Sequence, residues 1–407
     1  MNCRDVNRIF RESAYVRTGG TAQELACATY LIEECAKLGL SARLEPFDVR
    51  MYEEKTAKLI VDGKEIACKS VFGVPNGTVK GELFYLTGTD PVSLSKCKNK
   101  IVLCDKPVGY KLHDHLTAHG ALGYITYCGN NHFTDHDIDR REIRFETEHA
   151  IPAVTIHVSD AIDLVKRECK TVEMTVEQEA WIGSSNNVIL DLPGETGETV
   201  ILSAHYDSTL LSNGVYDNLS GAIGLLYLAE YFASRPRRRG IRFLWCGSEE
   251  RGLLGSLEYC RMHEEELGKT VLNVNLDMLG SIMGEFVIFS SVNEDMTEYL
   301  EKFARRHRVC ASVRHAIRSS DSNSFVYYGV PAISFARYTN AQTGLIHTRY
   351  DTVDIMSAKR LLSDMKTVAQ VTEIFVDCES FPISMEISER IRTETDDYMK
   401  RKRPANK

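Results

Sequence analysis

The sequence predicts an α/β protein in which a mixed, mainly parallel sheet is flanked by helices and carries a smaller β-rich insert. From about residue 187 onward, apolar strand-like runs alternate with helical segments. Residues 56–180 instead contain short β-rich runs separated by turn residues. The length of 407 residues suits two to three domains at roughly 100–200 residues each. We therefore expect one discontinuous domain over 1–55 and 181–385, an insert over 56–180 and a charged, solvated helical tail over 386–407.

The first half opens with a predicted amphipathic helix over 21–38. Thr21 and Glu24 there have the spacing of a capping box, and Gly39 follows the last turn. A strand is expected over 41–52. Within the β-rich insert, two segments have helical patterns, 111–120 and 158–168.

The second half alternates regularly between strands and helices. Residues 219–234 have an apolar helical face, and Pro236 ends that helix. Strands that alternate with helices imply parallel pairing, and ligands then bind beyond the carboxyl ends of the strands. The remaining predicted elements are strands at 187–194, 199–208, 241–250 and 271–280 and helices at 253–266 and 356–378.

Composition limits the classes of partner. The chain has 57 acidic and 49 basic residues and a net charge of −8, which argues against nucleic acid and against an anionic membrane surface. No run approaches the roughly 20 apolar residues of a membrane span. The first residues lack the apolar region of a signal peptide, so we expect a cytoplasmic protein. None of the 12 cysteines form a C-x-x-C pair.

Polar residues follow the predicted strands in five places. His205 and Asp207 share one face of a strand end, where a carboxylate can fix the imidazole tautomer. The alternative is a structural histidine with an incidental acidic neighbour. Asp217 directly precedes the helix over 219–234, where its alternative role is an N-cap.

The other three places lie further along the chain. Glu249 and Glu250 follow an apolar strand, and their mutual repulsion favours a metal ion or a shared proton. The alternative is a solvent-facing turn. Asp277 ends a buried strand and needs a partner, unless it caps a turn. His347 lies in a loop, where a lone histidine is commonly structural.

Together these residues offer two histidines and at least four carboxylates at one end of one sheet. Nitrogen and oxygen ligands of this kind suit two divalent cations, with one carboxylate bridging. One glutamate is left over, and an unligated glutamate beside a metal site can act as a general base.

These motifs, in this order, resemble the M28 family of co-catalytic zinc exopeptidases. The resemblance covers roughly 1–55 and 180–380, while 56–180 looks like the protease-associated (PA) domain that many members carry. The motifs are His205-Tyr-Asp207-Ser, Asp217-Asn-Leu-Ser-Gly, Gly247-Ser-Glu249-Glu250-Arg-Gly-Leu-Leu-Gly-Ser, Leu276-Asp277-Met, Ile346-His347-Thr and the N-terminal Arg17-Thr-Gly-Gly-Thr-Ala-Gln-Glu24.

The resemblance implies an aminopeptidase that acts on peptides with two Zn²⁺ ions, although cobalt or manganese would also suit such ligands. The resemblance implies that Asp217 bridges the two ions. Glu250 and His347 complete one site, and His205 and Asp277 complete the other. Glu249 is the implied general base, and Asp207 orients His205.

Two departures leave alternatives open. Some family members use a tyrosine to stabilise the oxyanion, and Ile346 and Ile317 occupy those positions here. The alternatives are that Arg318, Arg337, Tyr338 or another group replaces it, or that zinc alone suffices. An arginine could instead recognise a substrate carboxylate, so a carboxypeptidase or related amidohydrolase is the nearest alternative. The second alternative function is a non-catalytic receptor or scaffold of the same fold.

Three further features are assigned no catalytic role. We expect His113, His115 and His119 to have surface or packing roles within the insert. Residues 131–139 should form a loop, and the basic run 235–239 should complement a helix C-terminus.

Overall fold

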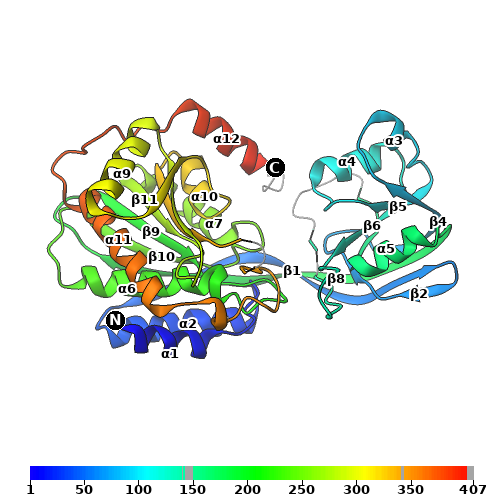
Figure 1. Cartoon of the computed structure of the whole chain (residues 1–407), viewed down its shortest axis with the longest axis horizontal. Helices are drawn as coiled ribbons and strands as arrows, with labels where there is room; N and C mark the ends of the chain where they lie inside the picture. Colours follow the sequence, from blue (N-terminus) through cyan, green and yellow to red (C-terminus); the bar gives the residue numbers. More distant parts are fainter. Residues whose placement is uncertain (140, 143–149, 341–342, 401–407) are drawn as a thin grey trace. The chain divides into compact units, whose positions relative to one another are not determined.

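The chain divides into two compact units in a computed structural model that describes residues 1–139, 141–142, 150–340 and 343–400. Unit 1 comprises Met1–Val49 and Gly183–Lys400, and unit 2 comprises Arg50–Ile182 (Figure 1). Strands β1 (Ala42–Val61) and β8 (Thr171–Leu192) each begin in one unit and end in the other. The borders expected from the sequence fall inside these two strands, where the backbone continues without a break.

The sheet of unit 1 has the strand order β13-β12-β14-β11-β9-β10-β8. Strand β9 pairs in parallel with β10 and β11, and β11 pairs in parallel with β14. Strands β12 and β13 are also parallel, whereas β8–β10 and β12–β14 are antiparallel. The mixed, mainly parallel sheet is thereby confirmed. Its strands are β9 (Thr199–His205), β10 (Gly240–Cys246), β11 (Thr270–Leu276), β12 (Glu285–Ser291), β13 (Ala311–His315) and β14 (Ala332–Tyr338).

Helices flank this sheet (Figure 1). The helix predicted over 219–234 is α6, and the one predicted over 253–266 is interrupted at His263 to give α7 and α8. No helix in the described ranges is long and apolar enough to cross a membrane. The helical elements of unit 1 are α1 (Cys3–Ser13), α2 (Ala22–Lys37), η1 (Val215–Leu219), α6 (Ser220–Ala233), α7 (Leu254–Met262), α8 (Glu264–Leu267), α9 (Glu294–His307), α10 (Ser322–Tyr327), η2 (Val353–Ile355), α11 (Ala358–Asp377) and α12 (Glu389–Lys400).

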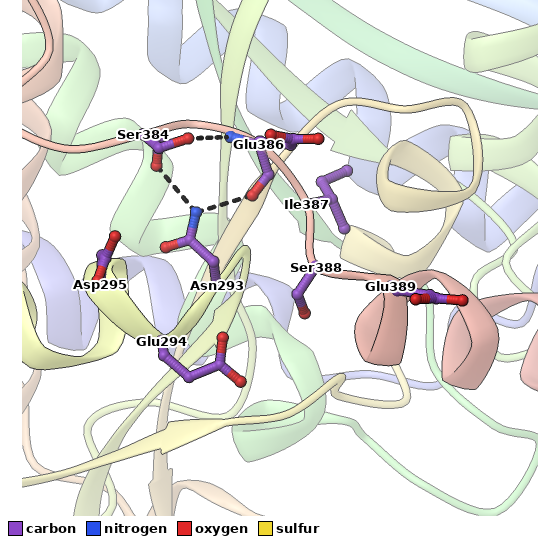
Figure 2. A pocket seen from close by; sticks show the side chains of 8 residues that line it. All are labelled: Asn293, Glu294, Asp295, Ser384, Glu386, Ile387, Ser388 and Glu389. Carbon is purple, nitrogen blue, oxygen red and sulfur yellow. Dashed lines mark hydrogen bonds between the residues drawn. The ribbon is translucent and has the colours of Figure 1, made fainter.

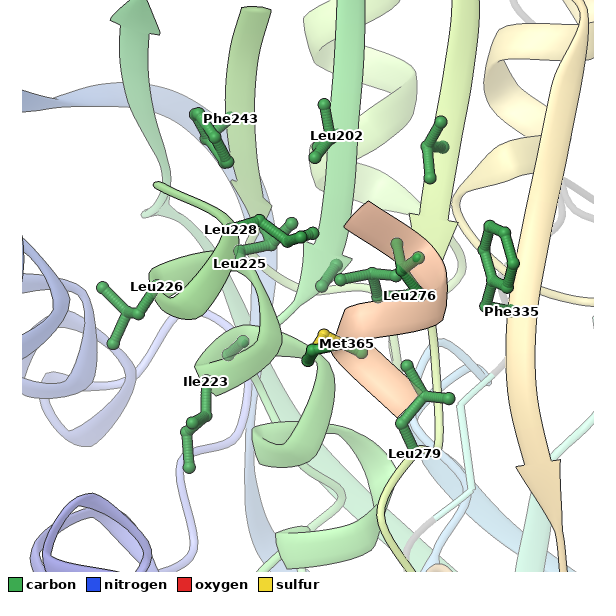
Figure 3. Packing of buried hydrophobic residues seen from close by; sticks show 14 of the residues in the cluster. Leu202, Ile223, Leu225, Leu226, Leu228, Phe243, Leu276, Leu279, Phe335 and Met365 are labelled. Carbon is green, nitrogen blue, oxygen red and sulfur yellow. The ribbon is translucent and has the colours of Figure 1, made fainter. Parts of the chain in front are cut away.

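The main core of unit 1 lies around α6. Figure 3 shows Leu225 and Leu228 of this helix close to Leu202 of β9 and Phe243 of β10, with Met365 of α11 nearby. All five side chains are fully buried, and burying a side chain of this kind contributes about 1.5–3 kcal/mol. Because α6 is apolar on nearly every face, it is fixed against both the sheet and α11.

Unit 2 is built on the parallel strand series β4-β5-β6-β7, with β3 antiparallel to β7. Both predicted helical segments are present, as α4 and α5, and 131–139 has no helix or strand. That this unit is a PA domain stays a prediction. Its elements are β2 (Lys64–Ile66), β3 (Lys69–Ser70), β4 (Gly77–Leu86), α3 (Pro91–Ser95), β5 (Lys100–Cys104), α4 (Tyr110–Ala118), β6 (Gly123–Cys128), β7 (Ala153–His157) and α5 (Val158–Lys166).

The C-terminal segment differs from expectation. The sequence predicts a solvated helix over 386–407, but Ile387 and Ile391 are buried against Val326 and Ala332. Within α12, the buried residues are Ile391, Thr395 and Met399, which lie four apart, so this helix has one buried face within a highly charged composition. Residues 401–407 of the predicted tail lie outside the described part of the chain.

A polar anchor precedes this helix. The Asn293 side-chain amide donates to the backbone carbonyls of Ser384 (3.1 Å) and Glu386 (2.8 Å), which fixes the chain beside the start of α9 (Figure 2). The expectation of a fully solvated helix is therefore wrong for residues up to 400, because Ile391, Thr395 and Met399 are buried.

Candidate metal centre

The predicted polar residues lie at the carboxyl ends of neighbouring strands of unit 1. His205 is the last residue of β9, and Asp277 directly follows β11. Glu249 and Glu250 follow β10, and Asp217 lies in η1 before α6. The structure brings His205, Asp217, Glu250 and Asp277 together with His347, from the loop after β14, as the sequence predicts. Glu249 belongs to neither ligand group, but its charge acts on His205.

Asp217 lies between the two histidines. Its Oδ1 is 3.1 Å from Nε2 of His205, and its Oδ2 is 3.2 Å from Nε2 of His347. Nε2 of His347 also lies 3.1 Å from Oε1 of Glu250, and Nε2 of His205 lies 3.8 Å from Oδ1 of Asp277. The donor atoms therefore form two groups, each within 4.8 Å, that share Asp217.

Asp217 does not need to cap the following helix. Oδ1 of Asn218 accepts the backbone N–H of Gly221 at 2.9 Å, in the first turn of α6. The Asn218 amide also donates to the carbonyl of Leu276 at 2.9 Å. A Cβ on Gly221 would lie 2.5 Å from that same carbonyl oxygen, so only glycine permits this close approach of α6 to β11. Asn218, rather than Asp217, therefore accepts a backbone N–H in the first turn of this helix.

Asp207 contacts the site in two ways. Its Oδ1 lies 3.3 Å from Nδ1 of His205, on the ring edge opposite Asp217. Its two oxygens also accept the backbone N–H groups of Glu249 (3.0 Å) and Glu250 (3.1 Å). One buried carboxylate therefore lies beside the imidazole and fixes the turn that carries both glutamates.

Glu24 supports the site, although the sequence places it only in a capping box and at the end of the N-terminal motif, with no role at the site. Thr21 accepts the Glu24 N–H as expected. The Glu24 carboxylate instead accepts hydrogen bonds from the backbone N–H groups of Ser248 (2.8 Å) and Gly20 (2.6 Å) and from the Ser185 hydroxyl (2.8 Å). Because Ser248 has a positive φ of 53° and precedes Glu249, this buried anchor stabilises a strained turn beside the site.

Asp351 is a second supporting residue, and no motif in the sequence marks it. Its carboxylate accepts the backbone N–H groups of Tyr216 (2.7 Å) and Asp217 (3.1 Å). Asp351 lies four residues after His347, so it links the histidine loop to η1. Only the proximity of the two segments in space reveals this role, because 134 residues separate the partners.

The arginines that the sequence nominates are both paired with aspartates. Nη2 and Nε of Arg318 lie 3.1 and 3.3 Å from Oδ2 of Asp277. Arg337 binds both oxygens of Asp364, at 2.6 and 2.9 Å. His113, His115 and His119 belong to neither candidate metal cluster found among the described residues.

The electrostatics of the cluster favour positive charge at its centre. Burial acts to lower the pKa of His205, but Glu249, Asp207, Asp217 and Asp277 outweigh it and raise that pKa well above its usual range. Burial likewise acts against the charged form of His347, yet hydrogen bonds with Asp217 and Glu250 raise its pKa to about 11.

The acidic groups divide into two kinds. Burial acts to raise the pKa of Asp217, but hydrogen bonds with His205 and His347 hold it well below the usual range. Burial raises the pKa of Glu249 well above its usual range; His205 opposes this shift, whereas the carboxylates of Glu250 and Asp277 add to it. Asp217 is therefore anionic while Glu249 readily holds a proton, which are different properties within one site.

The donor set is compatible with zinc. It consists of imidazole nitrogens and carboxylate oxygens, with no thiolate, which suits zinc and related divalent ions in an open rather than a purely structural site. Oδ1 of Asp277 is buried and has no hydrogen-bond partner among the described residues. A buried carboxylate oxygen without a partner is costly, and a bound cation would satisfy it.

Comparisons with known proteins agree with this geometry. Residues 187–372 match the sequence profile of Peptidase family M28. Aminopeptidase YwaD of Bacillus subtilis (strain 168) is 28% identical over 276 residues, which cover 65% of this chain and 58% of that protein. Aminopeptidase Y of Saccharomyces cerevisiae is 27% identical over 216 residues, which cover 49% of this chain and 40% of that protein. The chain spans about half the length of the relatives it matches.

A solved structure is similar over nearly the whole chain. BSAP, a zinc aminopeptidase from Bacillus subtilis, has a TM-score of 0.77 over 96% of this chain and 98% of its own, with 24% identity. At this identity the likeness shows a shared fold. The profile match lies within unit 1 and contains every predicted site residue. Unit 1 is thus similar to Peptidase family M28 over the segment that holds the candidate site.

Proposed function

We propose that this protein is a dizinc aminopeptidase that removes residues from the N-termini of peptides. The observation that carries the proposal is the placement of Asp217, whose two oxygens face two separate histidine–carboxylate pairs. A shared carboxylate of this kind is what two neighbouring cations require. The match to Peptidase family M28 and the names of the relatives support this activity.

The proposed ligands divide between two ions. His205 and Asp277 would hold one ion, Glu250 and His347 the other, and Asp217 both. Zinc is the proposed metal because the donors are imidazoles and carboxylates and because a structural relative is described as a zinc aminopeptidase. When bound, zinc polarises a carbonyl oxygen and makes water more acidic.

Glu249 is the proposed general base. Hydrogen bonds from the backbone N–H groups of Glu249 and Glu250 to Asp207 fix the backbone at this position, and Glu249 belongs to neither of the two candidate ligand groups. Its carboxylate would accept a proton from the attacking water and pass it to the leaving amine. Asp207 would keep the Nε2 of His205 directed toward Asp217 by holding Nδ1.

The structure also bears on the choice between aminopeptidase and carboxypeptidase. A carboxypeptidase needs a cation to recognise the C-terminal carboxylate. The two arginines nominated for that role already pair with Asp277 and Asp364 and are largely buried. We therefore favour the aminopeptidase. A non-catalytic scaffold would have no need of Glu249 beside an intact set of five ligands.

The proposal is tested with a panel of aminoacyl p-nitroanilides, assayed with and without a chelator and followed by metal analysis. We expect hydrolysis that the chelator abolishes and zinc restores, with about two zinc ions per chain. The matched control is the N-acetylated form of the best substrate, which should not be cleaved. Hydrolysis of acyl dipeptides with a free C-terminus, but of no p-nitroanilide, would instead support a carboxypeptidase.

A further inference from the structure

We propose that Arg318 is a positioning residue that leaves Asp277 a single oxygen with which to bind metal. This inference rests on the proposed function of the site. Both the Nε and the Nη2 of Arg318 contact Oδ2 of Asp277, at 3.3 and 3.1 Å. Oδ1 lies on the side of His205 and has no hydrogen-bond partner among the described residues.

A second buried arginine–aspartate pair in the same unit has a different geometry. Arg337 binds both oxygens of Asp364, one through Nε and one through Nη2. Two parallel bonds of that kind are the common arrangement between arginine and a carboxylate, and they leave neither oxygen unpaired. Arg318 uses the same two nitrogens on one oxygen only, so the free oxygen of Asp277 is a specific feature of this site.

Aromatic rings hold the Arg318 guanidinium in place. Its carbon lies 4.7 Å from the centre of the Tyr338 ring and 6.0 Å from that of Phe289. Arg318 and Asp277 each expose only 5% of their side chains. Cation–π contacts and burial together limit the rotation of the guanidinium, which in turn limits that of the carboxylate.

The consequence is a ligand of fixed shape. With Oδ2 held by Arg318, Asp277 can offer a cation only Oδ1 and cannot rotate to bind through both oxygens. A lysine at 318 would keep the positive charge but could not place two donors on one oxygen or stack as a planar group. The Arg318→Lys change therefore separates the geometric role from the charge.

The test measures zinc binding by competition with a chromophoric chelator on metal-depleted full-length protein. Arg318→Lys should weaken one of the two zinc sites by about 10–100-fold, the usual effect of losing a residue that orients a ligand. Arg337→Lys, the matched control, should bind both ions as the parent does. In an Asp277→Asn background, Arg318→Lys should have little further effect, because Arg318 acts through Asp277.

Several results would overturn the inference. Unchanged or tighter zinc binding by Arg318→Lys would mean that the guanidinium does not position the ligand. If the variant does not fold, a crystal structure of the zinc-loaded parent decides: Asp277 binding through both oxygens, or Arg318 turned away from it, contradicts the proposal. A parent that binds no zinc and hydrolyses no peptide would refute the proposed function instead.

Discussion

The buried anchor Glu24 gives a quantitative prediction about stability. We expect the stability difference between the parent and Glu24→Gln to change with pH in the metal-free protein. The pKa of Glu24 is about 7, raised from 4.5 chiefly by burial and then by Asp207. Between these two values, the folded state keeps a proton that the unfolded state has lost. The free energy of unfolding therefore falls as pH rises, and glutamine has no such dependence.

The size of this effect follows from the two pKa values. Between pH 5 and pH 8, the parent should lose about 2–3 kcal/mol of stability relative to Glu24→Gln. Asp321 and Asp351, whose pKa values burial raises to about 6, contribute equally to both proteins and cancel in the comparison.

The assay is urea unfolding followed by tryptophan fluorescence in the presence of a chelator. The protein has two tryptophans, so Trp181→Phe in every sample leaves the fully buried Trp245 of unit 1 as the reporter. Glu34→Gln is the matched control on the same helix. Hydrogen bonds from Arg8 and Lys37 outweigh burial and lower the pKa of Glu34. The stability difference between the parent and Glu34→Gln should therefore not change between pH 5 and pH 8.

The reasoning would be refuted by a parent–Glu24→Gln difference that is the same at both pH values. A difference that grows with pH would refute it as well, because it would require a lowered pKa. Either result would mean that Glu24 stays ionised in the folded protein.

Two further predictions concern the residues that support the site. Asp207→Asn should lower zinc affinity by about 10–100-fold, measured by chelator competition, because its amide cannot accept all three N–H groups that now face the carboxylate; an affinity equal to that of the parent would contradict this. Asp351→Asn should destabilise the protein by about 1–3 kcal/mol in urea unfolding, because the amide turns a donor toward the N–H of Tyr216 or Asp217. A change in the free energy of unfolding below about 0.5 kcal/mol would contradict a stabilising role for these two hydrogen bonds.

Much of the fold and of the site geometry could be predicted from local pattern. The alternation of apolar strands and helices predicts the parallel sheet, and polar residues at the strand ends predict where His205 and Asp277 meet. The carboxyl ends of parallel strands lie at one edge, so spacing along the chain becomes proximity in space.

Long-range partners were beyond such reasoning. Glu24 contacts Ser248 across 224 residues, and nothing in either local sequence specifies the other. The sequence suggests Arg318 as a substrate or oxyanion contact, but the structure pairs it with Asp277. In the C-terminal segment the high charge conceals the four-residue spacing of Ile391, Thr395 and Met399, which form the buried face of α12.

The central claim is that Glu249 transfers the proton while five other residues hold the metal. Its most direct test is the hydrolysis of the best aminoacyl p-nitroanilide by Glu249→Gln, with zinc content measured in the same preparation. We expect about two zinc ions, as in the parent, and a kcat lower by a factor of at least about 10²–10⁴. A zinc-loaded variant whose kcat stays within a few-fold of the parent value would contradict the account.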